Sequence, residues 1–175
     1  MARFPVRRAT SPVGSVHPVG EKPRPLRSSG VHHVGLSVSD LDRSITFYCE
    51  VLGGVLVRPP YAGERSAFVG RMALVMLGTT ALDLYEHSGN EGEDFVPTRT
   101  GLDHLALTAR SDEDLDAWAA HLDACGWARS EIRVAGDVGR MFDFRDPDGI
   151  QLELIFVDQA RLAHSATATA LRCTE

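Results

Sequence analysis

The sequence predicts an α+β fold built from two βαβββ repeats, because the second half of the chain echoes the first. His104 follows His33 by 71 positions, and Glu153 follows Asp83 by 70 positions. The tripeptide Gly-Arg-Met that begins at position 70 recurs 69 positions later. Three matches in near register indicate a duplicated unit, which brings side chains from remote parts of the chain towards one centre.

The first repeat covers residues 31–87. Residues 31–38 alternate as a short strand, and Ser39 or Asp40 caps a helix that runs to about Leu52. The Gly53-Gly54 pair ends this helix. Three strand-like runs follow, at residues 55–58, 67–77 and 81–87.

The second repeat covers residues 101–157 and follows a linker at 88–100 that is rich in Gly, Asn, Glu and Pro. A strand beginning near His104 leads to a helix that Ser111 caps and Gly126 ends. Strands are expected near 128–134, 139–144 and 150–157, with the turn signature Asp146-Pro-Asp-Gly before the last one. Residues 31–157 thus form one predicted domain.

The two ends of the chain look different from this domain. Residues 1–30 hold five Arg, one Lys and five Pro, which is typical of a basic, flexible tail. Residues 158–175 are expected to be a helical or frayed C-terminal tail. No stretch has the apolar length of a membrane span or a secretory signal.

Composition excludes several classes of protein. The 175 residues are 43% hydrophobic and 24% charged, as in ordinary globular proteins. A net charge of −6 gives no reason to expect nucleic acid as a partner. The three cysteines show no CxxC spacing, which favours incidental thiols in a reducing compartment, so a cytoplasmic location is expected.

Side-chain alternation predicts two unlike faces for each sheet. Each His shares its strand face with small residues, whereas leucines flank Asp83 and Glu153 and point the other way. One face therefore packs against helices, and the opposite, roomier face lines a cavity.

His33, His104 and Glu153 are the predicted metal ligands. Two imidazoles and one carboxylate commonly hold a catalytic divalent ion and leave positions open for water or substrate. The ion can be Fe, Mn, Ni, Co or Zn, and it would act as a Lewis acid on a substrate oxygen. Asp83 holds the fourth symmetric position and is either a further ligand, directly or through water, or a general base.

Four other residues are candidates for the pocket. Tyr85 and His87 share the parity of Asp83 and can line the cavity. Arg71 and Arg140 occupy equivalent positions and either hold a substrate anion or form salt bridges. His32 points away from His33 in a regular strand and is expected to be structural.

Several motifs resemble the vicinal oxygen chelate superfamily, which includes glyoxalase I, methylmalonyl-CoA epimerase, fosfomycin-resistance transferases, extradiol dioxygenases and bleomycin-resistance proteins. The motifs begin at His33 with HVGLSVSDL, at Leu102 with LDHLA and at Asp146 with DPDGIQLE. The resemblance covers residues 31–157. It implies one curved, glyoxalase-like, eight-stranded mixed sheet around a metal-centred cavity, usually in a homodimer, with the metal positions falling on His33, His104 and Glu153.

The resemblance leaves the reaction open. The first hypothesis is a metal-dependent lyase, isomerase or transferase acting on a small oxygenated substrate. The second is an Fe(II) extradiol-type dioxygenase, and the third is a metal-free protein of drug binding or bleomycin resistance. Typical glyoxalases have Glu where this chain has Asp83, so the trio is closer to the His-His-Glu pattern of the transferases and dioxygenases.

Overall fold

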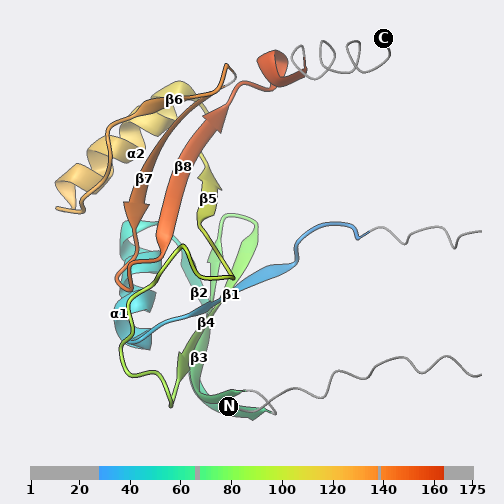
Figure 1. The fold of residues 1–175 in the computed structure, drawn as a ribbon, viewed down its shortest axis with the longest axis vertical. Coiled ribbons are helices and arrows are strands. Elements are labelled where there is room, and N and C mark those ends of the chain that lie inside the picture. The colour runs from blue at the N-terminus through green and yellow to red at the C-terminus, as the bar shows by residue number, and fades with distance from the viewer. Residues whose placement is uncertain (1–27, 66–67, 138, 164–175) are drawn as a thin grey trace, which may run out of the picture.

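The computed structural model describes residues 28–65, 68–137 and 139–163, and it confirms the α+β class. Both halves follow the order strand, helix and three strands, and they lie one above the other (Figure 1). The first half consists of β1 (His33–Ser37), α1 (Leu41–Thr46), the π-helical segment η1 (Phe47–Val51), β2 (Val55–Arg65), β3 (Phe68–Leu77) and β4 (Thr80–His87). The second half consists of β5 (Leu105–Thr108), α2 (Asp112–Ala124), β6 (Arg133–Ala135), β7 (Gly139–Arg145) and β8 (Gln151–Val157).

The described strands form two four-stranded sheets, in the orders β1-β4-β3-β2 and β5-β8-β7-β6. In each sheet the first strand pairs in parallel with the last strand of its half, and the other pairs are antiparallel. The resemblance implies a single eight-stranded sheet, whereas the described strands are hydrogen-bonded into two separate sheets. The parallel strands pair in an equivalent register in the two sheets, because Gly35 lies opposite Asp83 and Ala106 lies opposite Glu153.

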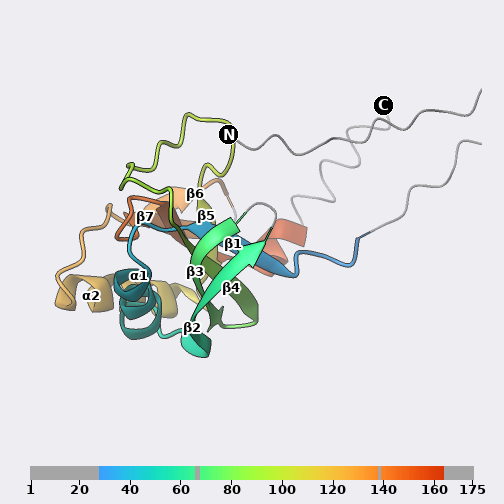
Figure 2. The ribbon, with the colours of Figure 1, turned by 90° about the horizontal axis from the view of Figure 1, so that it is seen from below.

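Both helices begin at the predicted caps. Asp40 accepts a hydrogen bond from the backbone N–H of Arg43, and Ser111 accepts one from that of Asp114. The first helix widens into the π-helical segment before Gly53 ends it with a φ of 69°. Both helices lie next to each other on one side of the molecule (Figure 2).

The core lies between these helices and the two sheets. Alternate residues of the inner strands are buried, including Val75, Leu82 and Leu84 in the first sheet and Phe142 and Leu152 in the second. They belong to a single hydrophobic cluster that spans both halves. The remaining face of each sheet is free of this core, and it carries the candidate site. No helix in the described part of the chain is long and apolar enough to cross a membrane.

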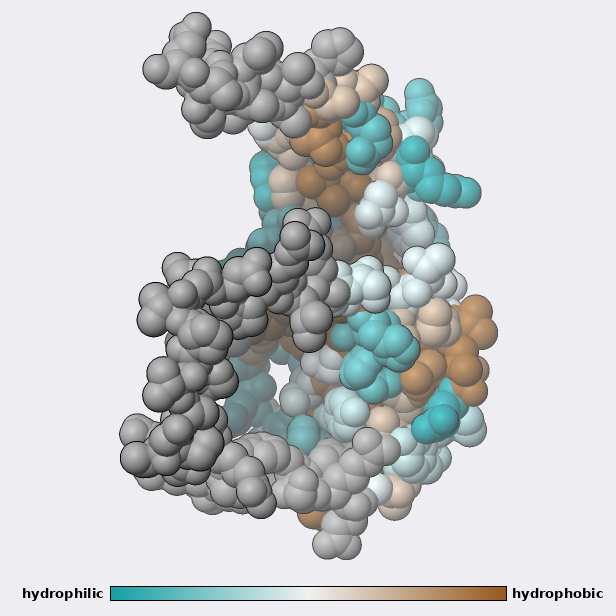
Figure 3. Space-filling model, turned by 90° about the vertical axis from the view of Figure 1, so that its right-hand side faces the viewer, coloured by the Kyte–Doolittle hydropathy of each residue, from teal (hydrophilic) through white to brown (hydrophobic). Residues whose placement is uncertain are grey.

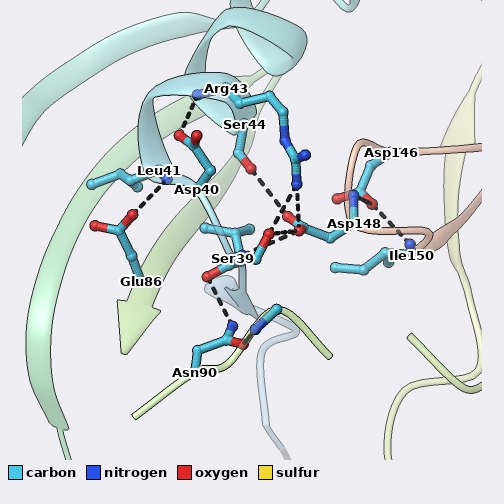
Figure 4. Close-up of polar contacts among 12 residues, drawn as sticks. Ser39, Asp40, Leu41, Arg43, Ser44, Glu86, Asn90, Asp146, Asp148 and Ile150 are labelled. Atoms are coloured by element: carbon cyan, nitrogen blue, oxygen red, sulfur yellow. Dashed lines mark hydrogen bonds and ion pairs between the residues drawn. The ribbon is translucent and has the colours of Figure 1, made fainter. Parts of the chain in front are cut away.

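The predicted Asp146-Pro-Asp-Gly turn connects the two halves of the chain, because its aspartate side chains form hydrogen bonds with residues of the first half. Asp148 accepts hydrogen bonds from the side chains of Ser39, Arg43 and Ser44, around the start of α1 (Figure 4). The buried carboxylate of Asp146 accepts one from the hydroxyl of Tyr48, with a donor–acceptor distance of 3.0 Å.

Asp146 is also bonded within its own turn. Its Oδ1 accepts hydrogen bonds from the backbone N–H groups of Asp148 and Ile150, at 2.9 and 2.8 Å. Burial nevertheless raises the pKa of Asp146 to about 6, because removing a carboxylate from water costs more than these bonds return. We name this set of contacts between the turn and the first helix the inter-half clamp.

Some predicted limits differ from the observed ones. β2 continues to Arg65 and is therefore longer than predicted, whereas the strand predicted near 128–134 is reduced to residues 133–135. Arg129 forms a single bridge with Phe144 in place of the missing part. The predicted N-terminal tail up to residue 27, the C-terminal tail beyond residue 163 and Cys173 lie outside the described residues.

Candidate functional site

The open face of the first sheet carries a pair of candidate metal-ligand side chains, His33 and Asp83. His33 begins β1, and Asp83 lies on β4, the neighbouring parallel strand. The His33 Nε2 and an Asp83 Oδ2 oxygen are 3.8 Å apart. The imidazole is half exposed, whereas the carboxylate is mostly buried.

The second sheet carries the equivalent pair, His104 and Glu153. His104 directly precedes β5, and Glu153 lies on β8. The His104 Nε2 and a Glu153 Oε2 oxygen are 3.7 Å apart. The shorter side chain of Asp83 therefore comes as close to its histidine as Glu153 does, and the two pairs are geometrically alike.

The other ring nitrogen of each histidine is engaged by the preceding residue. The Nδ1 of His104 lies 2.7 Å from a carboxylate oxygen of Asp103, and the Nδ1 of His33 lies 3.0 Å from the Nδ1 of His32. Hydrogen bonding at Nδ1 fixes the orientation of an imidazole and directs the Nε2 lone pair outwards. In both pairs Nε2 is the atom that faces the carboxylate.

These two pairs fit a divalent metal ion. The N···O separations of 3.7 and 3.8 Å exceed hydrogen-bond length, so the facing atoms are not bonded to each other. Histidine nitrogens and carboxylate oxygens bind zinc-like ions at about 2.0–2.2 Å, and both atoms of a pair can therefore reach one ion between them.

A complete ligand set is not assembled within the described part of one chain. No three His, Cys, Asp or Glu side chains in that part lie close enough together to hold a metal ion. The predicted trio is thus divided, since Glu153 is grouped with His104 while His33 is grouped with Asp83. Each half of the chain supplies two donors.

Two of the four predicted pocket residues lie beside the first pair. The Tyr85 hydroxyl donates to the Oδ2 of Asp83 at 3.3 Å, and the rings of Tyr85 and His87 stack with centroids 6.1 Å apart. Gly35 lies under the edge of the Tyr85 ring, where an added Cβ would meet the ring at 3.3 Å. A small residue at position 35 thus leaves room for the ring.

The two predicted pocket arginines make salt bridges to acidic side chains on the helices and on β4. Arg71 binds Asp42 of the first helix and Glu86, at 2.9 and 3.2 Å. Arg140 binds Asp112 and Asp116 of the second helix, at 3.2 and 3.0 Å. Of the two roles left open for them, the structure favours the structural one.

Four residues of the second pair's surroundings were not predicted. Besides Asp103, these are Asp143, Arg133 and Ser130, which form a polar network on the open face next to Glu153. The alternation of Asp143 with Phe142 and Phe144 was the available signal, because it places Asp143 on the face opposite to the two buried phenylalanines. His32 was likewise assigned to structure, although it contacts the ring of His33 edge-on, with centroids 5.2 Å apart.

The electrostatics of the second pair follow from this network. The hydrogen bond with Asp103 raises the pKa of His104, and burial raises the pKa of Glu153. The bond from Arg133 lowers the pKa of Asp143, which stays ionised beside Glu153. The network thus combines the guanidinium of Arg133 with the carboxylates of Asp103, Asp143 and Glu153. This surplus of negative charge favours a bound cation.

The donor pairs lie on the open sheet faces and are separate from two hollows that the described residues form. A hollow of about 670 Å³ lies beside Trp127 and Arg145, and another of about 500 Å³ lies between the β3–β4 turn and β5. Neither is lined by His33, Asp83, His104 or Glu153.

Comparison with known proteins agrees with the fold. The family model of the Glyoxalase/Bleomycin resistance protein/Dioxygenase superfamily matches residues 30–154. The uncharacterized protein YaeR of Escherichia coli (strain K12) is 34% identical over 125 residues, which cover 71% of this chain and 93% of YaeR. The 2-epi-5-epi-valiolone epimerase of Actinomyces sp is 32% identical over 149 residues, covering 71% of this chain and 78% of the epimerase.

A solved structure is similar over nearly its whole length. It is the glyoxylase/bleomycin resistance protein/dioxygenase domain from Frankia sp. EAN1pec, with a TM-score of 0.68 and 34% sequence identity. The match covers 76% of this chain and 95% of the Frankia domain.

Proposed function

The chain belongs to the Glyoxalase/Bleomycin resistance protein/Dioxygenase superfamily, and we propose that it is a divalent-metal-dependent enzyme of the vicinal oxygen chelate type. Its reaction is a Lewis-acid lyase, isomerase or transferase reaction on a small oxygenated substrate. The observation that carries this proposal is the pair of matched His–carboxylate sets with facing atoms 3.7 and 3.8 Å apart.

His33, His104 and Glu153 hold the ion, and Asp83 is the fourth donor. Asp83 is assigned to the ligands because its distance to His33, 3.8 Å, nearly matches the 3.7 Å between Glu153 and His104. A divalent ion, when bound there, stabilises the negative charge that develops on a substrate oxygen.

The surrounding residues keep the donors in place. Asp103 and His32 orient the two imidazoles through Nδ1, and Tyr85 holds Asp83 by its hydroxyl. Such partners of the ligands govern metal affinity as well as ligand direction.

We further propose that the protein is a homodimer in which each metal site takes one pair from each copy. The division of the donors into two pairs within the described chain supports this, as do exposed hydrophobic residues on the edge strands. Val55 and Val57 on β2 are 63% and 57% exposed, and Val134 on β6 is 74% exposed. Figure 3 also shows hydrophobic surface on the side of the molecule away from the helices.

The first test is the metal content of protein purified without chelators, measured by inductively coupled plasma mass spectrometry. We expect about one divalent ion per chain in the wild type, as in other sites with one set of ligands. His104→Ala should lose most of it, whereas the control His121→Ala should not, because His121 lies on the second helix and bonds to the carbonyl of Val51.

Unchanged metal content in His104→Ala would refute the ligand assignment. A wild-type protein that holds no ion even after reconstitution would instead favour a metal-free binding protein. Iron as the only bound metal would favour ring-cleaving dioxygenase chemistry.

The second test is complementation between two chains that each lack one histidine. His33→Ala and His104→Ala chains are refolded as a mixture. In a dimer with shared sites, a mixed pair contains one intact set of four donors, so random pairing restores about a quarter of the wild-type metal content. Recovery of none would show that each site is built within one chain.

A further inference from the structure

A line of neighbouring residues leads across the open face of the first sheet, away from the His33–Asp83 pair. Tyr85 bonds to Asp83, and its backbone neighbour across the sheet is Met72. The Tyr61 hydroxyl lies 2.8 Å from the sulfur of Met72, and the guanidinium of Arg58 lies over the Tyr61 ring, 5.7 Å from its centre. The line begins at the donor pair and ends at a positive charge.

Arg58 is placed on this face by an irregularity in β2. Residues 58 and 61 are three apart and would point to opposite faces of a regular strand. Their partners on β3, Leu74 and Met72, are two apart, so the strand bulges at Pro59-Pro60. A first register shift, between Leu56 and Arg58, precedes this bulge. With both shifts, Arg58 and Tyr61 lie on the same side of the sheet, which is the side that Asp83 occupies.

The charge of Arg58 has no acidic partner among the described side chains. Seven other arginines in the described residues form ion pairs: Arg43, Arg71, Arg110, Arg129, Arg133, Arg140 and Arg161. The contact of Arg58 is instead with an aromatic face, which holds a guanidinium in place without neutralising it. A fixed, uncompensated guanidinium is suited to binding a carboxylate or phosphate in a two-pronged way.

The distance between the two ends sets the size of the ligand. Arg58 lies opposite Leu74, and Leu74 lies opposite Asp83, so two strand spacings separate the arginine from the aspartate. Their backbones are therefore about 10 Å apart. The surface between them consists of Leu74, Met72 and the two tyrosine rings, and it is largely apolar.

We propose that Arg58 recognises the anionic group of the substrate and so determines its specificity. The substrate class is a small molecule with two adjacent oxygens for the metal ion, a short apolar or aromatic spacer, and a carboxylate or phosphate at the far end. This inference rests on the proposed function, since it takes the His33–Asp83 pair as part of the metal site.

The test uses the Mn(II)-loaded protein and two probes that differ in one charge. 3,4-Dihydroxyphenylacetate has adjacent oxygens, an aromatic spacer and a carboxylate, and 4-ethylcatechol is its neutral counterpart. Isothermal titration calorimetry gives the Kd of both probes for the wild type, for Arg58→Gln and for Arg110→Gln. Arg110→Gln is the matched control, because it removes the same charge from an exposed side chain paired with Asp114.

We expect the wild type to bind the carboxylate probe about tenfold more tightly than the neutral one. Arg58→Gln should lose this preference and keep its affinity for 4-ethylcatechol, and Arg110→Gln should behave as the wild type does. A preference that survives in Arg58→Gln would overturn the proposal.

Two further results would also overturn it, for reasons that can be told apart. Analytical ultracentrifugation of Arg58→Gln could show a changed oligomeric state, in which case Arg58 binds an acidic residue of a second copy. If neither catechol alters the Mn(II) electron paramagnetic resonance spectrum of the wild type, the proposed metal function fails, and the role of Arg58 fails with it.

Discussion

Asp146→Asn should remove a pH dependence from the stability of the protein. The carboxyl group of Asp146 is buried in the inter-half clamp and has a pKa of about 6. In the unfolded chain the same group titrates near 3.8. The folded state therefore holds the proton more tightly, and the stability that this proton provides is lost as the pH rises from about 4 to about 6.

The size of the effect follows from the two pKa values. A difference of roughly two units corresponds to about 3 kcal/mol in the free energy of unfolding. Asparagine is neutral at every pH, and its side-chain oxygen can still accept the two backbone N–H bonds that Asp146 accepts. The amide group of the asparagine can donate to the Tyr48 oxygen, so the clamp stays bonded.

Urea denaturation at a fixed protein concentration, repeated between pH 4 and pH 7.5, measures this difference. The free energy of unfolding of Asp146→Asn minus that of the wild type should rise by about 2–3 kcal/mol over this range and then level off. A difference that stays flat with pH would refute the argument that burial keeps this carboxyl protonated.

Two other substitutions test the packing. Tyr48→Phe removes the hydroxyl that donates to Asp146 and should cost about 1–3 kcal/mol at pH 7.5, measured by urea denaturation; an unchanged midpoint would show that this bond adds nothing. Gly139→Ala should cost about 2 kcal/mol or more, because its Cβ would lie 2.1 Å from the carbonyl oxygen of Phe156. The control Gly89→Ala meets nothing within 4 Å and should leave the melting temperature unchanged.

The repeat and the strand positions of the four candidate donors could be predicted from the sequence, because they depend on local alternation and on spacing along the chain. The strand register places Gly35 opposite Asp83 and Ala106 opposite Glu153, as the near-equal offsets indicated. The resemblance to the superfamily is confirmed by the family model.

The grouping of the donors could not be predicted, because it depends on how the two halves pack. Alternation shows which face a residue occupies, but it does not show that Glu153 is grouped with His104 while His33 is grouped with Asp83. The inter-half clamp could not be predicted for the same reason. Asp146 was assigned to a turn, and its bond to Tyr48 joins residues 98 positions apart.

Arg58 was missed for a different reason. Regular alternation was the only guide to its direction, and β2 shifts its register by one residue between Leu56 and Arg58 and again between Arg58 and Tyr61. A bulge reverses the face of every residue beyond it, so counting along the sequence fails at that point. Two prolines in succession were the available sign, because proline within a sheet is confined to edges and bulges.

The matched His–carboxylate pairs have an evolutionary consequence when the faces around them are compared. Near His33 and Asp83 the face holds methionine and tyrosine side chains, whereas near His104 and Glu153 it holds Arg133 and Asp143. Once a gene encoding one such unit has doubled, each copy can change its own wall while the donor positions are retained in both. Substitutions in one repeat alone can then change the wall of the open face, while the proposed cation site keeps its four donors.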